Sequence, residues 1–113
     1  MKVYFDDIEN PPMFNRYGEP MKWDKVIRSV PEMISLVKAG EVTYISFDYN
    51  FDYNMASKGM TGYDVAREIL VLAKSGSISP IDYDIHNSFD PATNLIDREM
   101  KDAWRVWEKE KGF

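Results

Sequence analysis

The chain contains no cysteine, and it has a single histidine, His86, among its 113 residues. The missing cysteine excludes disulfide bonds, thiolate catalysis and cysteine-based zinc sites, and it fits a reducing compartment. No apolar run approaches the roughly 18 residues of a membrane-spanning helix, and the N-terminus lacks the basic and apolar segments of a secretory signal. We therefore expect a cytoplasmic protein with no membrane partner.

Positive charge is scarce as well, since 14 lysine and arginine residues stand against 19 aspartate and glutamate residues and the net charge is −5. Such a chain has no broad attraction for a polyphosphate backbone, so we exclude long nucleic acid as a partner, whereas a local pocket could still hold one phosphate group. With 44% hydrophobic residues, the chain supplies one core and is too short for two. We expect residues 1–113 to form a single domain.

Short apolar runs alternate with helical patterns along the chain. Strands are predicted at residues 3–5, 25–28, 42–47 and 81–86. Helices are predicted to begin at Ser29 and Thr61, each with an acidic residue three positions later, and at Asp90, which precedes a proline. This alternation predicts a small three-layer α/β domain of the flavodoxin type, with a mainly parallel four-stranded sheet in the order 2-1-3-4.

Acidic residues end two of the predicted strands. Asp6 and Asp7 follow the first strand, Asp48 follows the third, and the fourth ends at His86. Because parallel strands deliver their carboxyl ends to one rim of a sheet, we expect these side chains to converge. Carboxylates suit Mg²⁺ or Mn²⁺ and leave water positions for phosphate oxygens, so Asp6, Asp7 and Asp48 are candidate metal ligands. His86 is a candidate general acid or base.

Some of these features also have purely structural explanations. Paired acids after a strand are common in turns and caps, and Thr61 with Asp64 can cap a helix without any substrate. The segment 10–23 is either a lid beside the carboxylates or a plain surface loop. Alternating oxygen ligands in residues 48–54 suggest a calcium loop, but the glycine and the terminal glutamate of an EF-hand are missing.

Four short motifs follow one another along the chain. They are Phe5-Asp6-Asp7, Ser46-Phe47-Asp48-Tyr49-Asn50-Phe51, Thr61-Gly62-Tyr63-Asp64 and His86-Asn87-Ser88-Phe89-Asp90-Pro91. The paired acids and the third aspartate resemble the Mg²⁺ pocket of response-regulator receiver domains. The order and spacing of all four motifs are more similar to those of the cyclic-phosphate-processing receiver domains. This resemblance covers nearly the whole chain and implies a receiver-like fold.

The resemblance also implies an activity. It implies metal-dependent hydrolysis, with Mg²⁺ or Mn²⁺, of a cyclic phosphate or related phosphoester on a nucleotide or RNA end. His86 and Asp48 would then be catalytic residues, and the partner would be a phosphorylated small molecule or nucleotide. Substrate-binding roles are implied for Asn50, Thr61, Asn87 and Ser88.

Departures from the family pattern keep other functions open. Tyr49 and Asn50 stand where the family usually has histidine and a second aspartate, and the last motif has an extra residue and Asp90 in place of asparagine. These changes favour the alternative of a non-catalytic pseudo-receiver that binds a nucleotide or a protein partner. Size and charge alone would also fit a small acidic inhibitor or accessory protein. The pattern shows no fifth strand ending in lysine, which disfavours a two-component response regulator.

Overall fold

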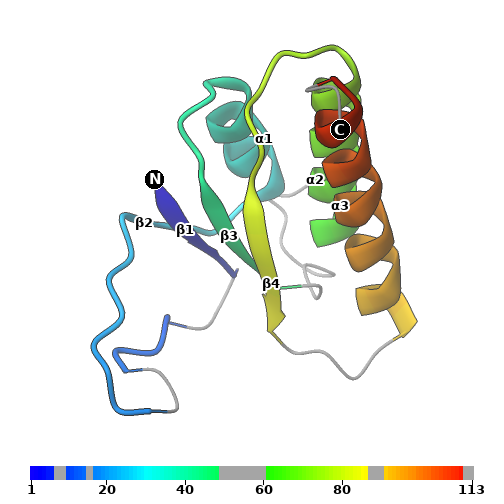
Figure 1. Ribbon diagram of the computed structural model, residues 1–113. Coiled ribbons are helices and arrows are strands. Elements are labelled where there is room, and N and C mark those ends of the chain that lie inside the picture. Colours follow the sequence, from blue (N-terminus) through cyan, green and yellow to red (C-terminus); the bar gives the residue numbers. More distant parts are fainter. Residues whose placement is uncertain (7–9, 15–16, 49–60, 87–90, 111–113) are drawn as a thin grey trace.

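The computed structural model describes residues 1–6, 10–14, 17–48, 61–86 and 91–110 (Figure 1). Its strands are β1 (Lys2–Phe5), β2 (Lys25–Ile27), β3 (Tyr44–Asp48) and β4 (Asp82–His86), and its helices are α1 (Val30–Lys38), α2 (Gly62–Lys74) and α3 (Pro91–Glu110). Every predicted strand and helix is present in the predicted order. The strand ends differ from the prediction by one or two residues.

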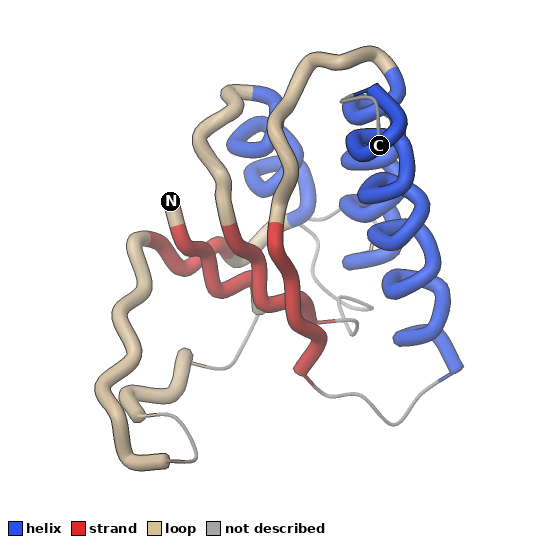
Figure 2. The backbone as a smooth tube through the Cα atoms, viewed as in Figure 1, coloured by secondary structure: helices blue, strands red, loops and turns tan. Residues whose placement is uncertain are grey.

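The four strands are all parallel and lie in the order β2-β1-β3-β4. The predicted strand order is therefore confirmed. The register pairs Phe5 with Phe47 and Asp48 with His86. The carboxyl ends of β1, β3 and β4 thus lie together, and we call the edge formed there by Asp6, Asp48 and His86 the carboxyl rim. Between β1 and β2, the described residues 10–14 and 17–24 lie away from the helices as loop segments (Figure 2).

The two faces of the sheet differ in chemistry because strand side chains alternate. Val3 and Phe5 of β1 belong to the hydrophobic core, as do Ile45 and Phe47 of β3, and all of them are fully buried. The residues between them point to the opposite face, which carries the carboxyl rim. The core face therefore stabilises the domain, whereas the opposite face is free to carry polar groups.

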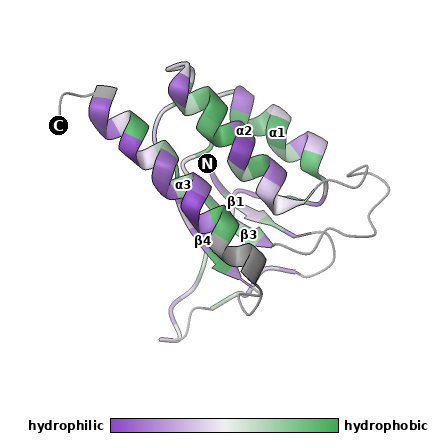
Figure 3. Cartoon of the chain, turned by 90° about the vertical axis from the view of Figure 1, so that its right-hand side faces the viewer, coloured by the Kyte–Doolittle hydropathy of each residue, from purple (hydrophilic) through white to green (hydrophobic). Residues whose placement is uncertain are grey.

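All three helices cover the core face, above the strands in Figure 3. Helix α1 connects β2 to β3 and α2 connects β3 to β4, so both connections cross the sheet in the same direction. Right-handed connections that run in the same direction place their helices on the same face of the sheet. The connection from β1 to β2 runs the other way and has no helix in the described residues. The expected third layer, a helix on the opposite face, is not found in the described residues. On that face Trp23 packs against Tyr4, with ring centroids 5.2 Å apart.

The ends of α1 and α2 show which predicted caps form. At α2, Thr61 Oγ accepts a hydrogen bond from the Tyr63 N–H (3.2 Å), and Asp64 accepts one from the Thr61 N–H (2.8 Å). This capping box is confirmed. At α1, the Ser29 side chain makes no capping bond, so the capping box predicted there is wrong. Pro31 follows within the first turn, and because proline has no N–H, one donor that a serine cap would use is missing.

The helices are held by a core and by indole hydrogen bonds. The sequence predicts an apolar stripe of Ile96, Met100, Ala103, Trp104 and Trp107 on helix α3. All of these residues are buried against α2 and the sheet except Trp104, which is partly buried beside them. The Trp107 Nε1–H donates to the Ile78 carbonyl (3.0 Å), so the buried indole leaves no unpaired donor. Among the described residues, no helix has both the length and the apolar character to cross a membrane.

A polar contact also ties α3 to the edge strand β4. The Tyr83 hydroxyl donates to Asp97 Oδ1 (2.6 Å), and the Lys101 ammonium lies 2.8 Å from Asp97 Oδ2. Burial and the neighbouring Asp97 raise the pKa of Tyr83. Burial pushes the pKa of Asp97 up, but hydrogen bonds from Lys101 and Tyr83 outweigh it and leave the pKa lowered. Asp97 therefore stabilises the fold at neutral pH, and this contribution is lost as the pH falls through the lowered pKa.

We predict that Tyr83→Phe lowers the free energy of unfolding by about 1 kcal/mol at neutral pH, because a short hydrogen bond to a carboxylate is lost. Tyr63→Phe is the matched control, since its hydroxyl reaches Glu99 at the longer distance of 3.3 Å, and it should cost about half as much. Urea denaturation measures both. An equal or smaller loss for Tyr83→Phe would contradict the role given to this contact.

Candidate functional site

Three side chains meet at the carboxyl rim. Asp6 follows β1, Asp48 ends β3 and His86 ends β4. One possible ligand atom from each of them lies within 4.8 Å of the others. The strand register causes this meeting, because Asp48 is directly opposite His86 and Asp6 extends β1 beside β3. Asp6, Asp48 and His86 therefore form a cluster whose donor types and spacing suit a metal ion.

His86 is held through both of its ring nitrogens. Nε2 lies 2.9 Å from Asp6 Oδ2, and Nδ1 lies 2.8 Å from Ser46 Oγ. The ring also stacks on Tyr4, with centroids 4.5 Å apart and planes 7° from parallel. Because an ionised carboxylate only accepts hydrogen bonds, we assign the ring proton to Nε2 and the donor role on the other side to Ser46. Three neighbours thus fix the orientation of the imidazole.

The two carboxylates at the rim are buried, and charges interact more strongly in a buried site than in water. Asp6 is 1% exposed and Asp48 is 3% exposed, whereas the His86 side chain is 19% exposed. Two ionised carboxylates would repel strongly where water is excluded, and a cation between them would offset that repulsion. The partial exposure of His86 leaves access to the cluster from solvent.

An arginine supports the rim from the loop side. The Arg28 guanidinium donates to the main-chain oxygen of Asp6 (3.3 Å) and to Asn10 Oδ1 (2.8 Å). These contacts join the end of β2 to the end of β1 and to the start of the segment 10–23. The segment 10–23 therefore begins next to the rim, which is the position that a lid requires.

Gly62 allows α2 to begin against the rim. A Cβ atom at this position would lie 2.5 Å from the Asp48 carbonyl oxygen and 3.3 Å from Ile96 Cδ1. Side chains do not tolerate the shorter of these distances to a backbone atom. The glycine of the Thr61-Gly62-Tyr63-Asp64 motif is therefore required by close packing between α2 and the end of β3.

The other residues predicted for the site divide into two groups. Thr61 is described, and its hydroxyl serves the cap of α2; a substrate contact remains a prediction. The remaining predicted metal ligand and substrate-binding residues lie outside the described residues, namely Asp7, Asn50, Asn87 and Ser88.

Sequence reasoning missed Ser46 and Tyr4 as parts of the site. Ser46 lies two positions before Asp48, on the same face of β3, and is 4% exposed. The alternation of strand side chains would have placed its hydroxyl on the carboxylate face. Tyr4 shares that face by the same alternation from Asp6. No pattern in the sequence reveals that both residues contact His86, since this depends on the register between strands.

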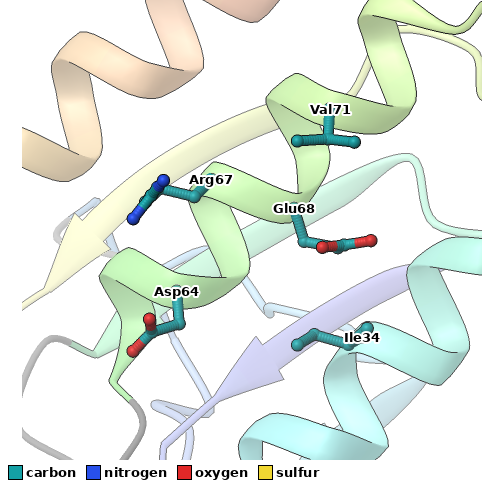
Figure 4. Close-up of a pocket in the computed structure, with 5 residues that line it drawn as sticks. All are labelled: Ile34, Asp64, Arg67, Glu68 and Val71. Atoms are coloured by element: carbon teal, nitrogen blue, oxygen red, sulfur yellow. The ribbon is translucent and has the colours of Figure 1, made fainter.

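A groove of about 240 Å³ lies elsewhere, on the helical side of the domain (Figure 4). Ile34 of α1 lines it together with Asp64, Arg67, Glu68 and Val71 of α2. None of these residues belongs to the cluster at the carboxyl rim. The chemistry predicted from the sequence therefore belongs to the rim and not to this groove.

Comparisons with known proteins place the chain in a family. A family model described as the cyclic-phosphate processing receiver domain matches residues 1–102. No curated protein and no solved structure matches the chain. The matched range spans all four strands, the first two helices and part of α3.

We predict that Gly62→Ala lowers the free energy of unfolding by about 1–3 kcal/mol, because the added methyl group overpacks the contact with the Asp48 carbonyl. Chemical denaturation measures the loss. Ala66→Gly is a comparison on the same helix that removes a methyl group without adding a clash; it should cost about 1 kcal/mol through helix propensity and lost burial. Unchanged stability in Gly62→Ala would show that α2 does not approach β3 this closely.

Proposed function

This chain belongs to the family of cyclic-phosphate processing receiver domains, and on that premise we propose that it hydrolyses a cyclic phosphate or a related phosphoester on a nucleotide or RNA end, assisted by Mg²⁺ or Mn²⁺. The observation that carries the proposal is the cluster of Asp6, Asp48 and His86, with ligand atoms within 4.8 Å of one another. Clefts at the carboxyl ends of parallel strands are where open α/β sheets bind their ligands.

The donor set fits the proposed cation. Asp6 and Asp48 would supply carboxylate oxygens, which both Mg²⁺ and Mn²⁺ accept. The imidazole nitrogen of His86, in the state in which it carries no proton, favours Mn²⁺ of the two. When bound, such a cation offsets the charge of a phosphate group and lowers the pKa of a coordinated water. Asp7 is proposed as a further ligand, because it follows Asp6 directly in the sequence.

His86 is the residue proposed to move a proton. Hydrolysis of a cyclic phosphodiester adds water to phosphorus and breaks one ring P–O bond, and the leaving ester oxygen takes a proton. His86 would donate that proton from Nε2 as a general acid, in the state in which the cation is held by the carboxylates alone. Its Nε2 now lies 2.9 Å from Asp6, so this contact must open for the nitrogen to reach a substrate.

Polar residues next to the rim in the sequence are proposed to bind the substrate. Asn50 follows Asp48 by two positions, and Asn87 and Ser88 directly follow His86. Amide and hydroxyl groups at these positions would donate hydrogen bonds to phosphate oxygens or to the ribose. Thr61 is proposed as a fourth contact from the start of α2.

A second candidate function is binding of a nucleotide or protein partner without turnover. The observation that favours it is the occupation of both ring nitrogens of His86, by Asp6 and by Ser46. A histidine held in this way fixes the structure of the rim and has no free nitrogen for proton transfer. Turnover distinguishes the two candidates.

We predict that Asp48→Asn weakens Mn²⁺ binding at least about tenfold, since a charged ligand becomes a neutral one. Asp84→Asn is the matched control, because Asp84 lies on the same face of the neighbouring strand, is exposed and is not part of the cluster. Isothermal titration of Mn²⁺ and Mg²⁺ into the three proteins measures the effect. Equal binding by all three, or none by the unaltered protein, would exclude a cation at the rim.

We also predict that the protein converts a 2′,3′-cyclic nucleotide to a nucleoside monophosphate in the presence of Mn²⁺, as followed by ³¹P NMR. His86→Gln should lower the rate at least about 100-fold, because general acid catalysis is lost, and chelation with EDTA should stop the reaction. Asp84→Asn should leave the rate unchanged. Binding of Mn²⁺ and nucleotide without any product would select the second candidate function instead.

A further inference from the structure

Ser46 is a buried hydroxyl whose position the proposed function leaves unexplained. It is 4% exposed, and its Oγ lies 2.8 Å from Nδ1 of His86. It stands one strand repeat before Asp48, on the face that carries the carboxyl rim. At this burial Ser46 offers almost no surface to a substrate. Any effect of Ser46 on the site is therefore exerted through its contact with His86.

The two hydrogen-bond partners of the His86 ring differ, because an ionised Asp6 can only accept a hydrogen bond whereas Ser46 can donate or accept one. An ionised Asp6 can only accept a hydrogen bond, so the contact at 2.9 Å requires a proton on Nε2. In the neutral ring that form leaves a lone pair on Nδ1, to which the Ser46 hydroxyl can donate. A cation bound by Nε2 needs the opposite arrangement, with the lone pair on Nε2 and the proton on Nδ1.

A hydroxyl can serve both arrangements because it donates and accepts with equal ease. When the ring proton moves to Nδ1, Ser46 can rotate its hydroxyl and accept from it at the same heavy-atom position. The net protonation of the ring does not change. The stacking of Tyr4 on the ring, with centroids 4.5 Å apart, is independent of which nitrogen carries the proton. Ser46 and Tyr4 can therefore hold the ring still while Nε2 leaves Asp6.

We propose that Ser46 is a positioning residue that allows His86 to exchange its ring proton between the two nitrogens and so present the Nε2 lone pair to a cation at the carboxyl rim. This inference rests on the proposed function in so far as it concerns the cation. Its first half, the control of the ring proton by Ser46, concerns the protein alone.

The single histidine of the chain makes the ring proton directly measurable. In protein labelled with ¹⁵N in histidine, the two ring nitrogens report which of them carries the proton, and about pH 8.5 is a suitable condition for the measurement. For the unaltered protein without metal we expect the form protonated at Nε2 to predominate. Zn²⁺ is the probe for the second form, since it is diamagnetic and binds imidazole nitrogen; it should move the proton to Nδ1.

Ser46→Ala tests the inference, and Ser46→Thr is the matched variant that restores the hydroxyl. Ser46→Ala should leave the metal-free ring protonated at Nε2, where Asp6 still accepts, and weaken Zn²⁺ binding by about 10-fold to 100-fold, because the Nδ1–H of the metal-bound ring then has no acceptor. Ser46→Thr should recover the affinity. If Ser46→Ala fails to fold, Ser46→Cys, which keeps the volume but bonds weakly, should show the same loss of affinity.

The outcomes separate this inference from the proposed function. Zn²⁺ affinity that matches the unaltered protein in Ser46→Ala or, where that variant does not fold, in Ser46→Cys would overturn the inference, even if the protein hydrolyses cyclic nucleotides. A loss of Zn²⁺ affinity in Ser46→Ala that Ser46→Thr reverses would support it, even if no hydrolysis occurs. An unaltered protein whose ring keeps its proton on Nε2 in the presence of Zn²⁺ would also overturn it, because the ring proton would then not exchange.

Discussion

The parallel register of β1, β3 and β4 is the constraint on which the rest of the structure depends. It places Asp48 opposite His86 and brings Asp6 beside them, although these residues are far apart in the sequence. The same register sends Phe5 and Phe47 into the core under the helices. One pairing pattern therefore builds the hydrophobic core on one face and the polar cluster on the other, so a slip of one residue would destroy both.

The placement of all three helices on one face has a functional consequence. The second face of the sheet has no helix over it in the described part of the chain, and Trp23 covers it only in part by packing on Tyr4. Tyr4 in turn supports the His86 ring. A polar cluster can thus be buried at its base, where Asp6 and Asp48 lie, and still reach solvent through His86. This combination is what a small domain needs if it is to bind a charged ligand.

Much of the fold could be predicted from the sequence, because apolar periodicity and capping residues are local signals. The strand order followed from the alternation of strands and helices, and the convergence of Asp6, Asp48 and His86 followed from that order. The helices lie on one face in the described part of the chain, and this follows from the predicted strand order together with right-handed connections. The expectation of a third layer did not use that signal. The contact of Ser46 with His86 depends on inter-strand register, which no local pattern reveals. The absent cap at Ser29 is different, because Pro31 is visible in the sequence and removes one of the donors that the cap would use.

The most direct test of the central claim is the anomalous X-ray scattering of crystals grown with Mn²⁺. A cation at the carboxyl rim predicts an anomalous peak within coordination distance, about 2.0–2.3 Å, of carboxylate oxygens of Asp6 and Asp48, with His86 turned from Asp6 toward the ion. An anomalous peak elsewhere on the surface, or no peak while His86 keeps its contact with Asp6, would contradict it.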